Sequence, residues 1–139
     1  MKLYASIYIG SYEIILKVFQ ITQKKRLKEL DCLRTPIDTA QDIYASGQLK
    51  KETVDRICNV LEDMKRTLAL YRLTEDYQIY AGSTFTAADN RLFAMEQIKL
   101  RTGMKVLALS NSEHRFMSYR AVASQDNFDA MVSESAAIV

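Results

Sequence analysis

Hydrophobic and polar residues alternate along the N-terminal part of the chain. Over residues 2–9 the apolar side chains stand at every second position, which is the period of a β-strand. A second β-branched and aromatic run covers residues 14–22, and a less regular alternation covers residues 27–33. Short turns at residues 10–11 and 23–25 separate these runs. The pattern therefore predicts three strands in an antiparallel meander.

The pattern changes after Pro36, the only proline of the chain, which marks the exit from the meander. Residues 37–49 form a connection, in which residues 40–45 are expected to make a short helical turn. Over residues 54–68 the apolar side chains recur at steps of three and four, which predicts an amphipathic helix. Charged residues fill its other face, which we interpret as a solvated surface.

Strands and helices alternate in the remainder of the chain. Residues 77–81 and 105–109 are short apolar runs typical of strands. Between them we expect one helix, which starts at a capping box of Thr86 and Asp89 and ends at Gly103. Its expected apolar stripe consists of Ala88, Leu92, Met95 and Ile98. A last helix follows, and the whole order predicts an α/β fold with a mixed five-stranded sheet and helices on its faces.

Charge and composition exclude several classes of protein. The chain has 139 residues, with 19 Lys and Arg against 17 Asp and Glu, so a net charge of +2 gives no footprint for nucleic acid. We interpret the basic cluster at residues 24–28 as a solvated turn. No apolar stretch approaches the length of a membrane span, and the N-terminus lacks a signal-peptide pattern. We therefore expect a cytoplasmic protein that binds neither nucleic acid nor membrane.

The two cysteines and the single histidine offer little chemistry. Cys32 and Cys58 are far apart and form no CxxC pair, so together with His114 they do not make a zinc site. We expect both cysteines to be reduced and buried, because free cysteine is among the most buried residue types. No metal ligands are predicted.

Small and hydroxyl residues gather where the predicted strands end. They occupy residues 10–12, 82–84 and 110–113. Ligands of open α/β sheets collect at the carboxyl ends of strands, and such loops offer N–H groups and hydroxyls to a phosphate. Each loop alone is also ordinary turn chemistry. Their topological positions together favour a phosphate site.

Four segments resemble one family in order and spacing. Residues 5–13, Ala-Ser-Ile-Tyr-Ile-Gly-Ser-Tyr-Glu, resemble the first phosphate loop, Asp-Ile-Gly-Ser-Asn-Ser, of exopolyphosphatase and guanosine pentaphosphate phosphatase (Ppx/GppA) proteins. Residues 33–49 are similar to the family's connection into its long helix. Residues 81–90 are similar to its second loop, and residues 109–115 to its Ser-Gly-Glu-Glu-Glu-Ala-Arg segment. The resemblance covers essentially the whole chain.

The resemblance implies an actin-like ATPase (ribonuclease H-like) fold and a site for phosphoanhydride hydrolysis. Residues 1–124 would be the first of two core domains, and residues 125–139 a linker and the start of a second domain. The apolar ending at residues 135–139 resembles the approach to the family's second phosphate loop. We therefore expect one domain of a longer protein, inactive by itself, which pairs with the second domain of the same parent chain.

The resemblance also implies roles for individual residues. Glu113 matches the catalytic glutamate, which would orient or deprotonate the attacking water, with Mg²⁺ and backbone amides stabilising the phosphate charge. A glutamate at a helix start is also a favourable partner for the helix dipole. Phosphate or guanosine nucleotide would be bound by Gly10, Ser11, Ser83, Thr84 and Arg115.

Five positions depart from the family pattern. Tyr8 replaces an aspartate, and Tyr12 and Glu13 replace an asparagine and a serine of the first loop. In the second loop Gly82 replaces a threonine and Thr86 a phosphate-binding arginine. A phenol is a poor substitute for a carboxylate at neutral pH, and Glu13 adds negative charge where phosphate would approach. The departures indicate weakened or lost hydrolysis in a retained fold, with Thr86 serving as a helix cap.

Two interpretations stay open, with a third behind them. One is a phosphohydrolase that acts on polyphosphate or guanosine pentaphosphate with Mg²⁺. The other is a non-catalytic relative that binds a nucleotide, a phosphate or a protein. A fragment of an acetate or sugar kinase is weaker, because the entry into the long helix matches the phosphatase family better. The exposed faces leave room for a homodimer, although no heptad pattern indicates one.

Overall fold

The computed structural model describes residues 2–24 and 26–108. Within them the chain forms strands and helices in the predicted order, with the one-turn helix at residues 83–86 as an addition. The elements are β1 (Lys2–Ile9), β2 (Glu13–Ile21), β3 (Leu27–Pro36), α1 (Thr39–Ser46), α2 (Lys51–Leu70), β4 (Tyr77–Ala81), α3 (Ser83–Thr86), α4 (Arg91–Thr102) and β5 (Val106–Ala108). The predicted last helix and the boundary at residue 124 lie outside the described residues.

The five strands form one mixed sheet in the order β3-β2-β1-β4-β5. The pairs β1–β2 and β2–β3 are antiparallel, as the meander predicted. The pairs β1–β4 and β4–β5 are parallel. The helices α1 and α2 precede β4 in the chain, and α3 and α4 lie between β4 and β5. The predicted α/β architecture is therefore confirmed.

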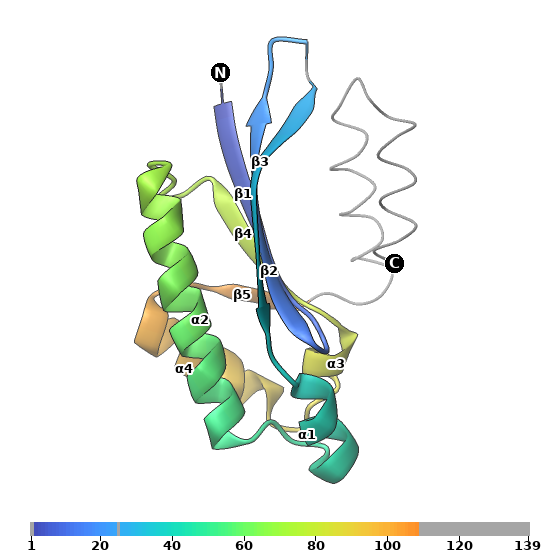
Figure 1. Ribbon diagram of the computed structural model, residues 1–139. Helices are drawn as coiled ribbons and strands as arrows, with labels where there is room; N and C mark the ends of the chain where they lie inside the picture. The colour runs from blue at the N-terminus through green and yellow to red at the C-terminus, as the bar shows by residue number, and fades with distance from the viewer. Residues whose placement is uncertain (1, 25, 109–139) are drawn as a thin grey trace.

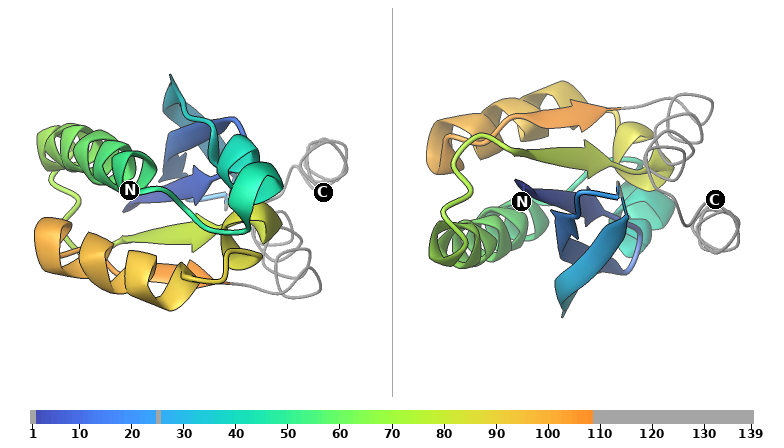
Figure 2. Two further views of the ribbon diagram at one scale, coloured as in Figure 1. Left: turned by 90° about the horizontal axis from the view of Figure 1, so that it is seen from below. Right: turned by 90° about the horizontal axis from the view of Figure 1, so that it is seen from above.

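The alternation in the sequence reflects which face of the sheet is covered. In β1 the side chains of Ala5, Ile7 and Ile9 are fully buried, whereas those between them are half-buried. The helices α2 and α4 cover this face, and α2 adds the fully buried Ile57 and Leu61 (Figure 1). The views along the sheet show these two helices side by side, with α1 and α3 at the end where β1 and β4 finish (Figure 2). The packing of this core thus fixes the positions of the ends of β1 and β4.

The region around Thr86 differs from the prediction. Thr86 is the last residue of the one-turn helix α3, and its hydroxyl donates to the Ser83 carbonyl at 3.1 Å. The Asp89 N–H donates to the Gly47 carbonyl at 2.8 Å, and α4 begins only after Asn90. The predicted capping box and the helix-cap role of Thr86 are therefore wrong, because the chain turns here to meet the segment between α1 and α2.

Three of the four residues of the predicted stripe face the core. Ala88 and Ile98 are fully buried, and Met95 packs against the core. Leu92 is the exception at 72 % exposed, whereas Ala94 is fully buried. The predicted end is confirmed, because Gly103 adopts the left-handed conformation at φ 73° as the C-cap.

The two cysteines differ in burial, although both are free thiols. Cys58 is buried in α2 as predicted. Cys32 is half-buried, so the prediction for it is wrong. It lies opposite Lys17 on the edge strand β3, where the sheet has a neighbour on one side only.

No helix within residues 2–24 and 26–108 is both long enough and apolar enough to cross a membrane.

Candidate phosphate site

The first two predicted loops lie side by side. Strands β1 and β4 are parallel neighbours, and their last residues, Ile9 and Ala81, pair in register. The Gly82 N–H donates to the Ile9 carbonyl at 2.9 Å, so both chains leave the sheet at the same edge. We call residues 10–12 loop 1 and residues 82–84 loop 2, and their meeting point the loop junction.

A hydroxyl pair joins the two loops across the junction. The Ser11 Oγ and Thr84 Oγ1 atoms lie 2.5 Å apart, although the residues are 73 positions apart in the chain. Both were predicted as phosphate-binding residues, and the structure brings them together. One hydroxyl of the pair donates to the other, which leaves one O–H that could donate to a phosphate oxygen at this point.

Loop 1 is bonded to the start of α1 through Thr39, a residue that the sequence analysis did not single out. The buried hydroxyl of Thr39 lies 2.9 Å from the Gly10 carbonyl and 3.1 Å from the Ser11 carbonyl, to which it donates. The N–H groups of Thr39 and Ala40 donate to the same Ser11 carbonyl at 3.0 and 3.2 Å. In the sequence, only the hydroxyl of Thr39 at the expected start of a helix after Pro36 could have indicated this role. These bonds fix the backbone of loop 1 before any ligand binds.

The glycines of the junction allow close packing and use their own N–H groups internally. The Gly10 N–H donates to the Glu13 carbonyl at 2.9 Å, and the Gly82 N–H is used by Ile9. In contrast, the N–H groups of Ser11, Ser83 and Thr84 donate to no carbonyl among the described residues. Within the described part of the chain, N–H groups that donate to no carbonyl therefore stand next to both glycines.

Tyr8 fills the space above both glycines. A Cβ atom on Gly10 would lie 3.1 Å from Tyr8 Cε1, and one on Gly82 would lie 2.9 Å from Tyr8 Cζ and still closer to its hydroxyl. Real Cβ atoms essentially never lie under 3.0 Å from another heavy atom, so a side chain at residue 82 would force the end of the Tyr8 ring to shift. Burial raises the pKa of the Tyr8 phenol, which keeps it neutral near pH 7.

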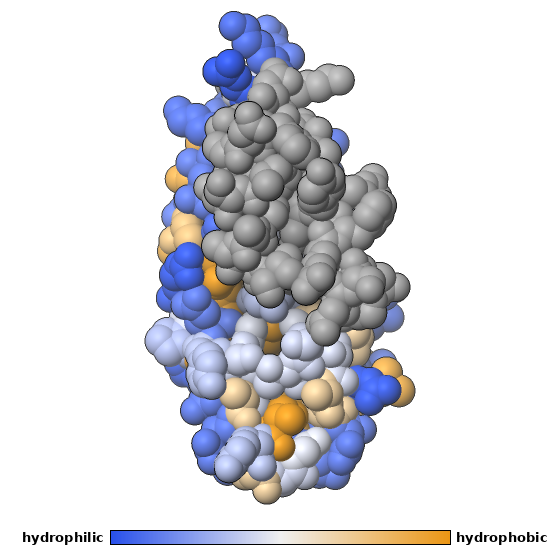
Figure 3. Space-filling model, turned by 90° about the vertical axis from the view of Figure 1, so that its right-hand side faces the viewer, coloured by the Kyte–Doolittle hydropathy of each residue, from blue (hydrophilic) through white to orange (hydrophobic). Residues whose placement is uncertain are grey.

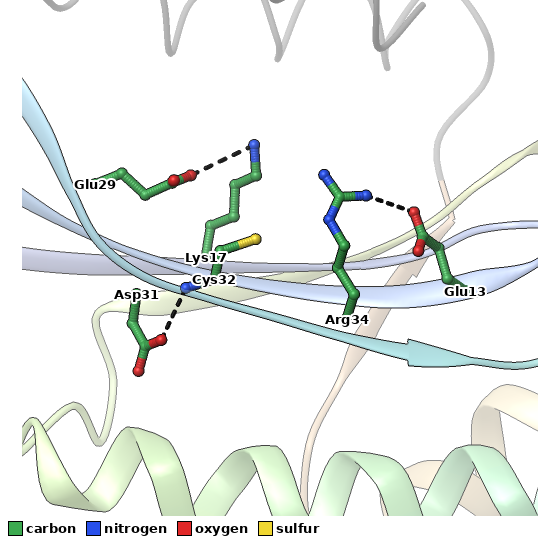
Figure 4. Close-up of polar contacts among 6 residues, drawn as sticks. All are labelled: Glu13, Lys17, Glu29, Asp31, Cys32 and Arg34. Carbon is green, nitrogen blue, oxygen red and sulfur yellow. Dashed lines mark hydrogen bonds and ion pairs between the residues drawn. The ribbon is translucent and has the colours of Figure 1, made fainter.

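The charge of Glu13 has a partner that the sequence did not reveal. Arg34 Nη1 on β3 lies 2.6 Å from Glu13 Oε1, and the pair points away from the helices α2 and α4 (Figure 4). The nearby glutamate charge raises the pKa of Arg34. The repulsion expected between Glu13 and phosphate is therefore reduced by a neighbouring positive charge.

The face of the molecule that carries α1 and α3 has mixed hydropathy. Figure 3 shows pale and hydrophobic residues together in its lower half, between more hydrophilic flanks.

Solved structures match this fold over most of the chain. A Ppx/GppA family member from Aquifex aeolicus aligns with a TM-score of 0.80 at 23 % identity. The alignment covers 88 % of this chain and 39 % of the Aquifex aeolicus chain. The fold is that of the Ppx/GppA proteins. An exopolyphosphatase from Cytophaga hutchinsonii aligns with a TM-score of 0.77 at 15 % identity, over 86 % of this chain and 38 % of its own.

These matches confirm that the predicted α/β fold is shared with structures of Ppx/GppA proteins. The chain spans about two fifths of the length of the structures it matches, which are covered to 39 % and 41 % in two Aquifex aeolicus examples. No family model matches the sequence. No curated protein matches it closely enough to be counted as a relative.

Two residues that the Ppx/GppA resemblance assigns to the site are not among those described. Glu113 and Arg115 lie within residues 109–139, together with the third predicted loop. Their catalytic and phosphate-binding roles stay predictions. The described part of the site consists of Gly10, Ser11, Ser83 and Thr84.

The described residues do not fit a magnesium site. Mg²⁺ takes oxygen ligands in strict octahedral geometry, with one or two carboxylates in most phosphate sites. No three His, Cys, Asp or Glu side chains gather within residues 2–24 and 26–108. Glu13, which follows loop 1, is paired with Arg34. Among these residues the loop junction offers hydroxyl oxygens but no unpaired carboxylate.

Proposed function

We propose that this chain is the phosphate-binding N-terminal part of an exopolyphosphatase-like protein, and that its loop junction binds the terminal phosphates of polyphosphate or guanosine pentaphosphate. The observation that carries the proposal is the hydroxyl pair of Ser11 and Thr84, which joins two loops at the ends of parallel strands. Phosphate oxygens accept hydrogen bonds from hydroxyl groups and from unpaired N–H groups, and both kinds of donor lie at this point.

Titration with inorganic tripolyphosphate tests this proposal. The variants Ser11→Ala and Thr84→Val each remove one hydroxyl of the pair. We expect each to weaken binding about ten- to hundredfold, because a hydrogen bond to a charged group is worth about 1.5–3 kcal/mol. Thr22→Val is the matched control, because Thr22 lies in the hairpin after β2, at the end of that strand away from the loop junction. Equal weakening by the control would show that the loss is not specific to the junction.

A non-catalytic protein is the second candidate, and Tyr8 favours it. Hydrolysis requires a group that orients or deprotonates water near the phosphate. The neutral phenol of Tyr8 occupies the space over Gly10 and Gly82, where the resemblance leads us to expect a carboxylate. Thr86 bonds back to Ser83 and offers no positive charge in place of the family's arginine.

Phosphate release separates the two candidates. The longer parent protein is incubated with polyphosphate or guanosine pentaphosphate, with and without Mg²⁺. Turnover that is abolished by Glu113→Gln would support hydrolysis with Glu113 as the base. Binding of tripolyphosphate without any release would support the non-catalytic protein.

A further inference from the structure

The ring of Tyr8 occupies the place between the two glycines of the loop junction. It reaches from β1 to within van der Waals distance of both loops, as the close approach to Gly10 and Gly82 shows. The neighbouring strand is parallel and in register, with Tyr8 beside Tyr80, so the ring lies at the edge where both loops leave the sheet. The ring fills the space beside both glycines, so a hydrated divalent ion could not occupy that space.

The oxygen atoms around the ring are also unsuited to a hard cation. Ser11 and Thr84 hydroxyls share a hydrogen bond with each other at 2.5 Å. The Glu13 carboxylate is engaged by Arg34 at 2.6 Å. The carboxylate ligands that Mg²⁺ prefers are therefore not free among the described residues of the junction.

The groups that remain free suit an anion without a metal. The N–H groups of Ser11, Ser83 and Thr84 donate to no carbonyl within the described part of the chain. The ion pair of Glu13 and Arg34 leaves little net charge beside them. Tyr8 adds no negative charge, because burial raises its pKa. A bare phosphate oxygen therefore meets hydrogen-bond donors and no strong repulsion.

We propose that Tyr8 closes the loop junction to a divalent cation, so that this chain binds a phosphoanhydride as the bare anion without Mg²⁺. The inference rests on the proposed function, since it concerns the same site. It adds that Tyr8 determines whether the phosphoanhydride is bound as the free anion or as its Mg²⁺ complex. A family site with a carboxylate at this position would take the metal complex instead.

Titration of the full chain with inorganic tripolyphosphate, in EDTA and in Mg²⁺, tests the inference. The two titrations are compared at equal concentrations of uncomplexed tripolyphosphate, because Mg²⁺ also binds the ligand in solution. The wild type should bind with the same Kd within about twofold in both buffers. Tyr8→Asp should bind at least tenfold more weakly in EDTA and regain affinity in Mg²⁺. Tyr8→Phe keeps the ring and should stay independent of the metal.

The outcomes separate failure of the inference from failure of the proposed function. Wild-type affinity that rises tenfold or more with Mg²⁺ would overturn the inference and leave phosphate binding standing. Equal metal-free binding by Tyr8→Asp would overturn it as well. If the wild type binds tripolyphosphate in neither buffer, the proposed function fails and the inference fails with it.

A measurement on the wild type does not depend on the folding of any variant. Paramagnetic Mn²⁺ is added to the isotope-labelled chain with and without tripolyphosphate, and the amide signals of Ser11, Gly82 and Thr84 are followed by NMR. We expect these signals to shift with tripolyphosphate and to stay sharp with Mn²⁺. Their selective broadening would place a cation at the junction and contradict the inference.

Discussion

The phenol of Tyr8 rests against the backbone of Gly82, so each residue limits what the other can be. The Cζ atom of Tyr8 lies 2.9 Å from the position that a Cβ atom on residue 82 would take. Gly82 has φ −75°, which any residue adopts, so contact with Tyr8 rather than backbone conformation disfavours a side chain here. This contact couples β1 to the loop after β4.

A double-mutant cycle measures that coupling. Gly82→Ala should lower the free energy of unfolding by about 1–3 kcal/mol, because the added methyl group overpacks the site. In a Tyr8→Ala background the same change should be nearly neutral, which gives a coupling energy of about 1 kcal/mol or more. Urea denaturation of the four proteins gives the value. Strictly additive effects would show that the ring does not rest on Gly82.

Thr39 should stabilise loop 1 through its hydroxyl. Thr39→Val leaves the Gly10 and Ser11 carbonyls with one donor fewer in a buried place, so we expect a loss of about 1–3 kcal/mol in urea denaturation. Thr39→Ser keeps the hydroxyl and serves as the control. The prediction fails if both variants lose the same stability, since the methyl group rather than the hydrogen bond would then be responsible.

Asn90 should hold the start of α4 to the connection before α2. Its Oδ1 accepts from the Leu49 N–H at 2.9 Å, and its Nδ2 donates to the Leu49 carbonyl at 3.0 Å. Asn90→Ala removes both bonds and should cost about 1–3 kcal/mol in thermal or urea unfolding. Asn59→Ala, on an exposed position of α2, is the matched control and should be neutral or slightly stabilising. A loss of the same size in the control would argue against the role of Asn90.

Arg72 marks a position where glycine should be better. It follows α2 with φ 58°, the only non-glycine residue with positive φ among those described. Arg72→Gly should raise the free energy of unfolding by about 0.5–1 kcal/mol, since glycine reaches this conformation without steric penalty. Arg66→Gly, inside α2, should instead lower it by about 1 kcal/mol. A lower melting temperature for Arg72→Gly would contradict the prediction.

Stability should fall in strongly alkaline solution. Burial raises the pKa of Tyr8 and of Tyr4 in the folded chain, above the value of about 10 in an unfolded one. The folded state therefore retains the phenol protons to higher pH than the unfolded state. The resulting contribution to the free energy of unfolding is fully present below about pH 10 and is lost as the pH rises through the pKa of the folded chain. Urea titrations from pH 8 to 11 should show the decline. Tyr8→Phe should flatten it, whereas Tyr44→Phe, at a side chain 90 % exposed, should not.

Short-range patterns predicted most of the sheet and helices correctly. The alternation in β1 and the three-and-four spacing of α2 reflect burial against one face, so the residues themselves carry the information. The prediction failed at residues 86–90, because bonds from Asp89 and Asn90 to Gly47 and Leu49 end one helix and start another. Those partners are about 40 positions away, beyond the reach of local periodicity.

The candidate site divides in the same way. Gly10, Ser11, Ser83 and Thr84 could be named from loop chemistry at strand ends, and the parallel register of β1 and β4 then brings their loops together. The contact of Tyr8 with Gly82, the Thr39 hydroxyl beneath loop 1 and the pairing of Glu13 with Arg34 emerged only from the folded chain. Local composition and periodicity set which segments become strands and loops. Contacts between distant segments depend on strand register and side-chain packing, and these decide which of the candidate residues meet.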